Sequence, residues 1–175
     1  MRSLLLLLAV LPTHLFAQDQ RSSEISFLET GVICAPETVG TAPAPDTVAG
    51  VTNVIEEDPP FVSTANRVPA VLGLGFGVKA TSQTTAGIED VIVIVRHPAM
   101  GPEGATVQSY ATRITGQGTS NALYQFDFEY ELLPGRWSIE ARKAGQLLYR
   151  SQFEVVPPQD IPELAGACGF EELLS

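Results

Sequence analysis

The region from Asn121 to Val156 most constrains what this chain can fold into, because apolar and polar residues alternate along three of its segments. Successive side chains of a strand point to opposite faces of the sheet, so this alternation is typical of half-buried antiparallel strands. The first segment predicts a strand with an aromatic inner face and a polar outer face, the inner residues being Tyr124, Phe126, Phe128 and Tyr130 and the outer ones Gln125, Asp127, Glu129 and Glu131. Pro134 and Gly135 then predict a turn, because proline fixes φ and glycine tolerates a positive φ.

The two following strands carry large apolar residues on their inner faces, Trp137, Ile139 and Ala141 in one and Leu147, Tyr149, Phe153 and Val155 in the other. The side-chain register sets the length of the loop between them. A two-residue turn would place Ile139 opposite Arg150 and so mix the core with solvent. A three-residue loop at residues 143–145 would pair Ile139 with Tyr149 and would place glycine at the left-handed position of such a loop. We therefore predict the three-residue loop.

Turn residues divide the rest of the chain into further expected strands at residues 24–33, 48–55, 68–80, 91–95 and 105–115. Residues 35–46 are rich in proline, so we expect an extended surface connection without a hydrogen-bonded ladder. Residues 91–95 form a continuous β-branched run, which predicts a central strand covered on both faces. Gly73, Gly75 and Gly77 alternate along residues 68–80 and leave a flat strip. We expect a neighbouring segment or a large side chain to cover this strip, the alternative being a recognition platform.

About eight strands with short turns, almost no helix and a Trp in a late strand predict an all-β fold, an antiparallel immunoglobulin-like β-sandwich. A jelly roll or an open barrel is the alternative, because periodicity does not give the order of strands in a sheet. The expected organisation is a signal peptide at residues 1–17, the sandwich domain at residues 18–158 and a C-terminal tail at residues 159–175. The tail is expected to hold one helical turn near Glu163.

Residues 1–17 have the pattern of a secretory signal peptide, with Arg2 at the start, an apolar run from Leu4 to Leu11 and a cleavage site after Ala17. The apolar run is too short to span a bilayer, which needs about 20 residues. Removal of residues 1–17 leaves 20 acidic and, without Arg2, 9 basic residues. This excess disfavours nucleic acid and anionic membranes as partners, because both are bound through clustered Lys and Arg. We expect a periplasmic or secreted protein with no membrane insertion after cleavage.

Cys34 and Cys168 are the two cysteines of the chain. In an oxidising compartment the simplest expectation is one structural disulfide between them, which would join the first strand to the C-terminal tail. It would close a loop of about 135 residues and contribute about 5 kcal/mol in the chain-entropy model. A redox-active pair needs CxxC spacing or an activated thiolate, and the sequence shows neither.

His97 and Met100 follow the β-branched run and belong to residue types that bind soft metals, so a copper site is conceivable. Two ligands without a second His or a Cys instead predict packing against the end of the sheet. The outer carboxylates Asp127, Glu129 and Glu131 predict a solvated acidic face. Calcium loops take their ligands from a curved backbone, and a glycosidase needs carboxylates opposed across a cleft. We therefore expect no catalytic, metal-binding or cofactor-binding residue.

The run YQFDFEYELLPGRWSIEARKAGQLLYRSQFEVV, with VIVIVRHPAMGP and GVICAPETVGTAPAPDTVAGV upstream, resembles the bacterial family called domain of unknown function 3859. The resemblance spans residues 26–168, nearly all of the chain after the signal peptide. It implies a scaffold and an exported bacterial protein. It carries over no catalytic residues, because the family has no assigned function.

Two functions from different classes fit these observations. The first is a non-catalytic binding or assembly module of the Gram-negative periplasm, which would take a protein or peptide partner through an exposed strand edge or the loops at one end. The second is a metal-handling protein or a loop-assembled enzyme, in which nucleophilic catalysis would have to use His97. A His97 ring that is buried and bonded to backbone favours the first function. An open cleft with a Ser or a carboxylate near the ring favours the second. We predict the first function and no enzymatic activity.

Overall fold

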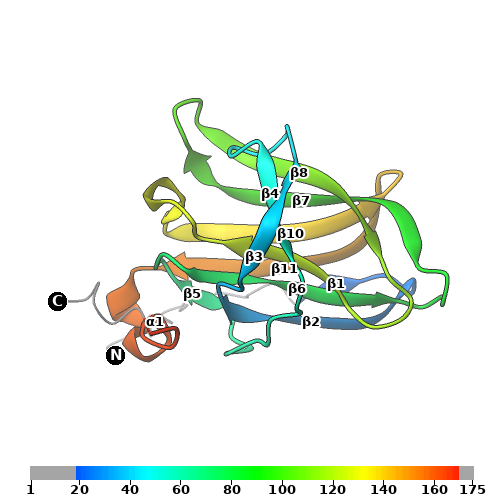
Figure 1. Cartoon of the computed structure of the whole chain (residues 1–175), viewed down its shortest axis with the longest axis horizontal. Helices are drawn as coiled ribbons and strands as arrows, with labels where there is room; N and C mark the ends of the chain where they lie inside the picture. Colours follow the sequence, from blue (N-terminus) through cyan, green and yellow to red (C-terminus); the bar gives the residue numbers. More distant parts are fainter. Residues whose placement is uncertain (1–18, 170–175) are drawn as a thin grey trace, which may run out of the picture.

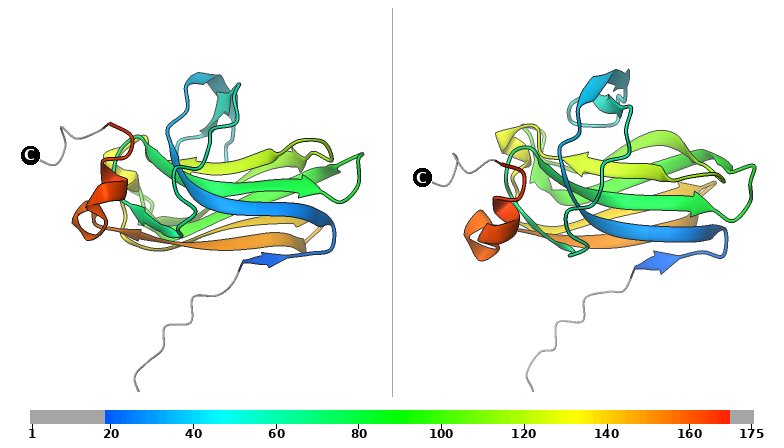
Figure 2. Two further views of the ribbon diagram at one scale, coloured as in Figure 1. Left: turned by 90° about the horizontal axis from the view of Figure 1, so that it is seen from below. Right: turned by 60° about the horizontal axis from the view of Figure 1, so that its bottom comes forward.

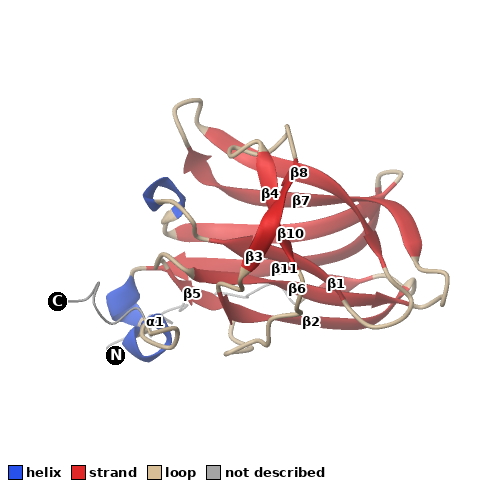
Figure 3. Cartoon of the chain, viewed as in Figure 1, coloured by secondary structure: helices blue, strands red, loops and turns tan. Residues whose placement is uncertain are grey.

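The computed structural model describes residues 19–169, which form two packed sheets, a separate β-hairpin and short helical turns (Figure 1, Figure 3). The strands are β1 (Gln20–Arg21), β2 (Ile25–Cys34), β3 (Thr38–Pro43), β4 (Val51–Ile55), β5 (Arg67–Pro69), β6 (Leu74–Ser82), β7 (Ile88–Met100), β8 (Ala105–Ile114), β9 (Ser120–Gln125), β10 (Gly135–Lys143) and β11 (Gln146–Val156). The helical turns are η1 (Glu129–Glu131), η2 (Pro158–Asp160) and α1 (Pro162–Ala165). None of the helices in this part of the chain is long and apolar enough to cross a membrane. The predicted signal peptide lies outside the described residues.

The larger sheet has the strand order β1-β11-β10-β7-β8, with β5 also paired to β11. The smaller sheet has the order β2-β6-β9, and β3 and β4 pair with each other in a separate two-stranded sheet. All of these pairs are antiparallel except that of β5 with β11. The chain is therefore an antiparallel β-sandwich, as predicted, and Figure 2 shows the β3–β4 hairpin standing out from its two layers.

Aromatic side chains from both sheets fill the core where the layers meet. Phe76 on β6 packs against the rings of Tyr124, Phe126, Trp137 and Phe153, with centroids 4.6–5.9 Å away. The indole N–H of Trp137 donates to the carbonyl oxygen of Leu133 at 3.0 Å, so its polar atom is satisfied inside the core. Full burial of a side chain such as Phe76 contributes about 1.5–3 kcal/mol. The inner faces predicted for the first half of the aromatic segment and for β10 are confirmed here.

The predicted aromatic strand is wrong beyond Phe126. Strand β9 ends at Gln125, and η1 follows, so Phe128 and Tyr130 are 47% and 40% exposed instead of facing the core. The cause is Glu131, whose Oε2 accepts the backbone N–H groups of Asp127 at 2.6 Å and Phe128 at 2.9 Å. A side chain that bonds nearby backbone in this way competes with a strand ladder.

The predicted three-residue loop between β10 and β11 is also wrong. Lys143 pairs with Gln146, which leaves Ala144 and Gly145 as a two-residue turn with φ values of 47° and 81°. Two positive φ values are what a type I′ hairpin turn requires. A register shift beside Ala141 absorbs one residue, so the inner face of β10 still points into the core without a longer loop.

Two expectations for the other strands need correction. Residues 35–46 were expected to hold no ladder, yet residues 38–43 of β3 pair with residues 51–55 of β4. The only proline inside the paired stretch is Pro43, at the end of β3, where the loss of one donor costs little. Strand β7 is central, between β10 and β8, but Ile92 on its outer face is 40% exposed, so this strand is not covered on both faces.

The glycine strip is packed internally, as expected. A Cβ atom on Gly75 would lie 2.6 Å from the carbonyl oxygen of Tyr124, and one on Gly77 would collide with the carbonyl oxygen of Ala122. Glycine at these positions lets β9 approach β6 closely. Gly31, which pairs with Gly77, lies under the Phe61 ring in the same way.

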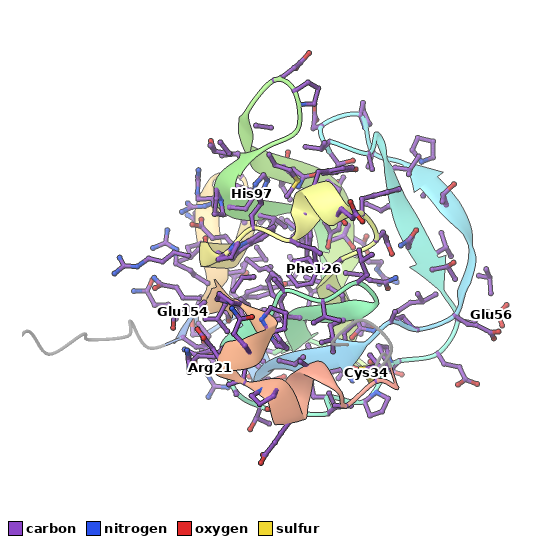
Figure 4. All side chains as sticks on the ribbon, turned by 90° about the vertical axis from the view of Figure 1, so that its left-hand side faces the viewer. Arg21, Cys34, Glu56, His97, Phe126 and Glu154 are labelled. Atoms are coloured by element: carbon purple, nitrogen blue, oxygen red, sulfur yellow. A yellow bond between two sulfur atoms is a disulfide. The ribbon has the colours of Figure 1, made fainter. Side chains whose placement is uncertain are left out.

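A disulfide between Cys34 and Cys168 joins the end of β2 to the tail beyond α1. Helix α1 is the helical turn expected near Glu163. Ala165 is buried against the core, and Leu164 and Cys168 pack beside it. The described part of the tail, up to residue 169, therefore belongs to the packed structure at the end of the sandwich where Figure 4 labels Cys34.

Candidate functional site

The sandwich has one side whose strand edges carry no further strand. On the opposite side, β1 and β5 cover the edge of β11. The edge of β2 is covered in part by residues 62–63, because Val32 donates its N–H to Ser63 and accepts from that of Val62, each at 2.8 Å. Within residues 19–169, β8 and β9 end the two sheets, and no further strand pairs with either of them. The two edges without a paired strand therefore belong to consecutive strands on one side of the molecule.

The β3–β4 hairpin overhangs this side and is anchored at several points. The loop at its tip bonds β8, because Ser109 donates its N–H to the carbonyl oxygen of Asp46 at 3.0 Å. The N–H of Val48 in the same loop donates to Oε1 of Gln108 at 2.7 Å. Strand β4 reaches the end of β9 through Asn53, whose amide donates to Oδ2 of Asp127 at 3.0 Å. These bonds hold the hairpin in one position over the strand edges.

A cleft of about 850 Å³ lies between the hairpin, the edges of β8 and β9, and η1. Its wall is mostly uncharged and includes Thr41 and Val51 of the hairpin, Tyr110 of β8, and Asn121, Leu123 and Gln125 of β9. The charged side chains that line it are Asp127 and Glu131, and no Lys, Arg or His is among the lining residues. Binding clefts usually have volumes of about 300–1,000 Å³ and a few polar groups placed among apolar ones. This cleft is therefore the best candidate site in the described part of the chain.

The edge of β9 presents free backbone groups to the cleft. Phe126 donates its N–H to Leu74 at 2.9 Å, and residues of the same parity along β9 bond β6 in the same way. Asn121, Leu123 and Gln125 therefore direct their N–H and C=O groups away from β6. Among the described residues, no backbone hydrogen bond to another segment uses these groups. The edge of β8 is less open, because the N–H of Ser109 is already bonded to the hairpin loop.

The side chain of Asn121 adds a polar atom to the same edge. Its Oδ1 atom is buried and has no hydrogen-bond partner within residues 19–169. A buried acceptor without a donor costs about 1–3 kcal/mol. A ligand that donates to this atom would relieve the cost.

Glu131 organises the end of the cleft at η1. Besides accepting two backbone N–H groups, its carboxylate accepts the hydroxyl of Tyr124 at 3.0 Å. Burial raises the pKa of Glu131, while its hydrogen bonds to the backbone N–H groups act in the opposite direction. Burial also raises the pKa of Tyr124, so this hydroxyl stays protonated and donates. The pair fixes η1 against the end of β9.

His97 lies inside the sandwich and not in an open cleft (Figure 4). Its Nδ1–H donates to the carbonyl oxygen of Pro98 at 2.8 Å, and its Nε2 lies 3.1 Å from the amide nitrogen of Gln108, which donates to it. The ring packs on that of Trp137, with centroids 5.0 Å apart. Burial lowers the pKa of His97, which agrees with a neutral ring that accepts at Nε2. Both ring nitrogens are therefore used in packing the sandwich end.

Met100 completes this buried cluster, because its sulfur accepts the Tyr124 hydroxyl at 3.6 Å. The described residues contain no group of three His, Cys, Asp or Glu side chains that could hold a metal ion. His97 and Met100 thus lie as expected for residues packed against a sheet end.

The structure separates the three carboxylates that the sequence placed in one line. Glu131 is buried and bonded to backbone, Asp127 faces the cleft, and Glu129 is exposed on η1. The cleft residues on β9 were missed, because periodicity shows which face of a strand is buried but not which strand ends a sheet. The polar residues Asn121 and Gln125 on the outer face of β9 were the available signal.

Comparison with known proteins shows the family of this chain and supports its fold. A family model described as domain of unknown function (DUF3859) matches residues 21–155. An immunoglobulin-like protein from Pseudomonas aeruginosa is similar in structure, with a TM-score of 0.50 and 18% identity over 80% of this chain and 98% of that one. The predicted immunoglobulin-like fold is thereby confirmed. An alkylpurine DNA glycosylase from Pseudomonas fluorescens reaches a TM-score of only 0.31, with 14% identity over 53% of this chain and 28% of that one, and supports no argument. Among curated proteins, none matches this chain.

Proposed function

We propose that this chain, which belongs to the DUF3859 family, is an exported, non-catalytic recognition protein that binds an extended polypeptide segment in the cleft under the β3–β4 hairpin. The observation that carries the proposal is the uncovered edge of β9 inside that cleft. The backbone groups of Asn121, Leu123 and Gln125 there point away from β6. An extended segment can add to such an edge as a further strand, with main-chain hydrogen bonds giving affinity and side-chain pockets giving specificity.

Strand β9 is long enough for strand addition. Strand β9 spans residues 120–125, and a strand rises about 3.3 Å per residue, so an added segment of about six residues would pair along it. The hairpin would cover the outer side of that segment, since residues of both β3 and β4 line the cleft. Because the hairpin is bonded to β8 and Asp127, the cleft is largely formed before binding, which lowers the entropic cost of association.

The alternative function, metal handling or catalysis at His97, has weaker support. The two ring nitrogens of His97 are bonded to Pro98 and Gln108, and the ring packs against that of Trp137 inside the sandwich. A general base needs a free nitrogen within reach of the proton that it takes. This arrangement favours a packing role for His97.

Export is the second half of the proposal. The signal-peptide pattern of residues 1–17 supports a periplasmic or secreted location. The Cys34–Cys168 disulfide supports it too, because such bonds persist mainly in oxidising compartments.

The proposal is tested by selecting peptides from a displayed random library against the purified mature protein and measuring their binding to two variants. Leu123→Pro removes the edge N–H, and leaves the ladder to β6 intact because that N–H faces away from β6. Leu123→Ala is the matched control, since it shortens the same side chain and keeps the N–H. Circular dichroism would establish that both variants fold.

We expect selected peptides to bind the wild-type and Leu123→Ala proteins alike and to lose at least about tenfold in affinity for Leu123→Pro. Failure to enrich any peptide, or equal binding to the folded proline variant, would overturn the proposal. Binding of an oligosaccharide by the wild-type protein, with no peptide enriched, would assign the cleft to another ligand class.

A further inference from the structure

The end of the cleft at η1 has features that select a particular side chain in the bound segment. Asp127 lies where the chain leaves β9, and its two carboxylate oxygens each accept one amide, from Asn53 at 3.0 Å and from Gln125 at 2.6 Å. A carboxylate has about four acceptor sites, so about two remain available. Within residues 19–169, no Lys or Arg forms an ion pair with Asp127. An oriented carboxylate therefore faces the cleft without a counter-charge.

An aromatic pair stands beside this carboxylate. The rings of Phe128 and Tyr130 are nearly parallel, with an interplanar angle of 6° and centroids 5.2 Å apart, and both line the cleft. They are among the most exposed large apolar side chains of the described residues. The face of an aromatic ring attracts a cation, with a typical contribution of about 0.5–1 kcal/mol at an exposed site. Exposed aromatic rings next to an unpaired carboxylate are the surroundings in which a cationic side chain is stabilised.

Asp127, Phe128 and Tyr130 form the corner of the cleft at η1, and the backbone of this corner is fixed. Glu131 accepts the N–H groups of Asp127 and Phe128, which sets the position of both residues relative to β9. Its own carboxylate adds negative charge to the same end of the cleft, and no basic side chain lines the cleft to offset it. The negative charge of the whole chain, −10, acts in the same sense.

We propose that the segment bound along β9 carries a lysine or arginine side chain that is held at this corner by Asp127, Phe128 and Tyr130. The inference rests on the proposed function, because the corner lies in the binding cleft, and it defines the class of segment recognised. The hydrogen bonds of the added strand hold its backbone, and the corner selects a cation near one end of the segment.

The test uses the peptides selected from the random library, now read for composition. We expect one position near an end of the selected sequences to be enriched in Lys or Arg. Binding should weaken with rising salt, because the contact is between charges. Asp127→Asn removes the charge and keeps one acceptor oxygen, which can still accept the amide of Asn53 that anchors the hairpin. This variant should bind the basic peptides about tenfold more weakly.

Two controls separate the corner from the rest of the cleft. Glu129→Gln removes a carboxylate that is exposed on η1 and does not line the cleft, and its affinity should equal that of the wild-type protein. A peptide with alanine at the enriched position should bind the wild-type and Asp127→Asn proteins equally. The inference would be overturned if the selected sequences showed no enrichment in Lys or Arg. It would also be overturned if Asp127→Asn preferred the basic peptide over the alanine peptide as strongly as the wild-type protein does. If Leu123→Pro still abolished binding, strand addition itself would stand.

Discussion

Replacement of both Cys34 and Cys168 with alanine should lower the free energy of unfolding by about 5 kcal/mol. The two residues are 134 positions apart, so the bond closes nearly the whole domain into one loop. In the chain-entropy model, a loop of this size removes about 17 cal/mol/K from the unfolded chain, which is about 5 kcal/mol at 25 °C. Ala165 is buried in the core and Leu164 packs against it, so we expect these contacts to remain in the variant and the loss to arise mainly in the unfolded state.

Urea unfolding followed by the fluorescence of the buried Trp137 measures this loss. With a slope of about 2 kcal/mol/M, the midpoint should fall by about 2.5 M. Reductant should move the wild-type midpoint to that of the double variant and leave the variant unchanged. A loss of unfolding free energy below about 1 kcal/mol, or an effect of reductant on the variant itself, would refute the reasoning. The Cys34–Cys168 disulfide would then not constrain the unfolded chain.

Three further predictions use the same unfolding measurement. Gly77→Ala should lose at least about 2 kcal/mol because its Cβ would collide with β9, whereas Gly40→Ala, in open space on β3, should change little. Burial alone would raise the pKa of Glu140, but hydrogen bonds from Arg142 and Arg150 hold this pKa below the usual 4.5. Ionised Glu140 therefore stabilises the fold above pH 4.5. This stabilisation is lost as the pH falls through the lower pKa of the folded state. Glu140→Gln should cost about 1–3 kcal/mol at pH 7 and weaken that acid dependence. Burial lowers the pKa of His97 below 6.5, so below this pH the unfolded chain takes up a proton that the folded chain does not. The free energy of unfolding of the wild-type protein should therefore fall as the pH drops below 6.5. In His97→Gln this decrease should be smaller.

The sequence predicted the sandwich and its core because one buried face leaves a period of two along a strand. Strand β2 was expected at residues 24–33 and β8 at residues 105–115, and both lie within one residue of these bounds. Packing of the glycine strip followed from the same pattern, since an alternating glycine face must be covered closely. The family assignment was also predicted from the sequence, and the match over residues 21–155 confirms it.

The errors arose where a local interaction replaced the ladder without changing the alternation. Glu131 bonds the backbone of Asp127 and Phe128, so η1 forms inside a segment that still alternates perfectly. Between β10 and β11, the register shift beside Ala141 leaves Leu148 of β11 unpaired and lets a two-residue turn keep the core faces aligned. Periodicity does not show such a bulge.

The candidate site was largely beyond the sequence, because it depends on contacts far apart in the chain. The hairpin covers β9 only because Asn53 and the loop at residues 46–48 bond distant residues. Pairing of β3 with β4 was itself not foreseen. The composition did indicate the character of the site, since the chain is acidic and the cleft holds carboxylates without a basic partner.

Amide hydrogen exchange with and without a selected peptide tests the central claim most directly, because it reports each backbone N–H of β9 separately. Strand addition predicts that the N–H groups of Asn121, Leu123 and Gln125 become protected when the peptide binds. Those of Ala122 and Tyr124, which already face β6, should change little. Protection that appears only at the edge of β2 or of β11, or binding that leaves the alternate amides of β9 unchanged, would contradict the account.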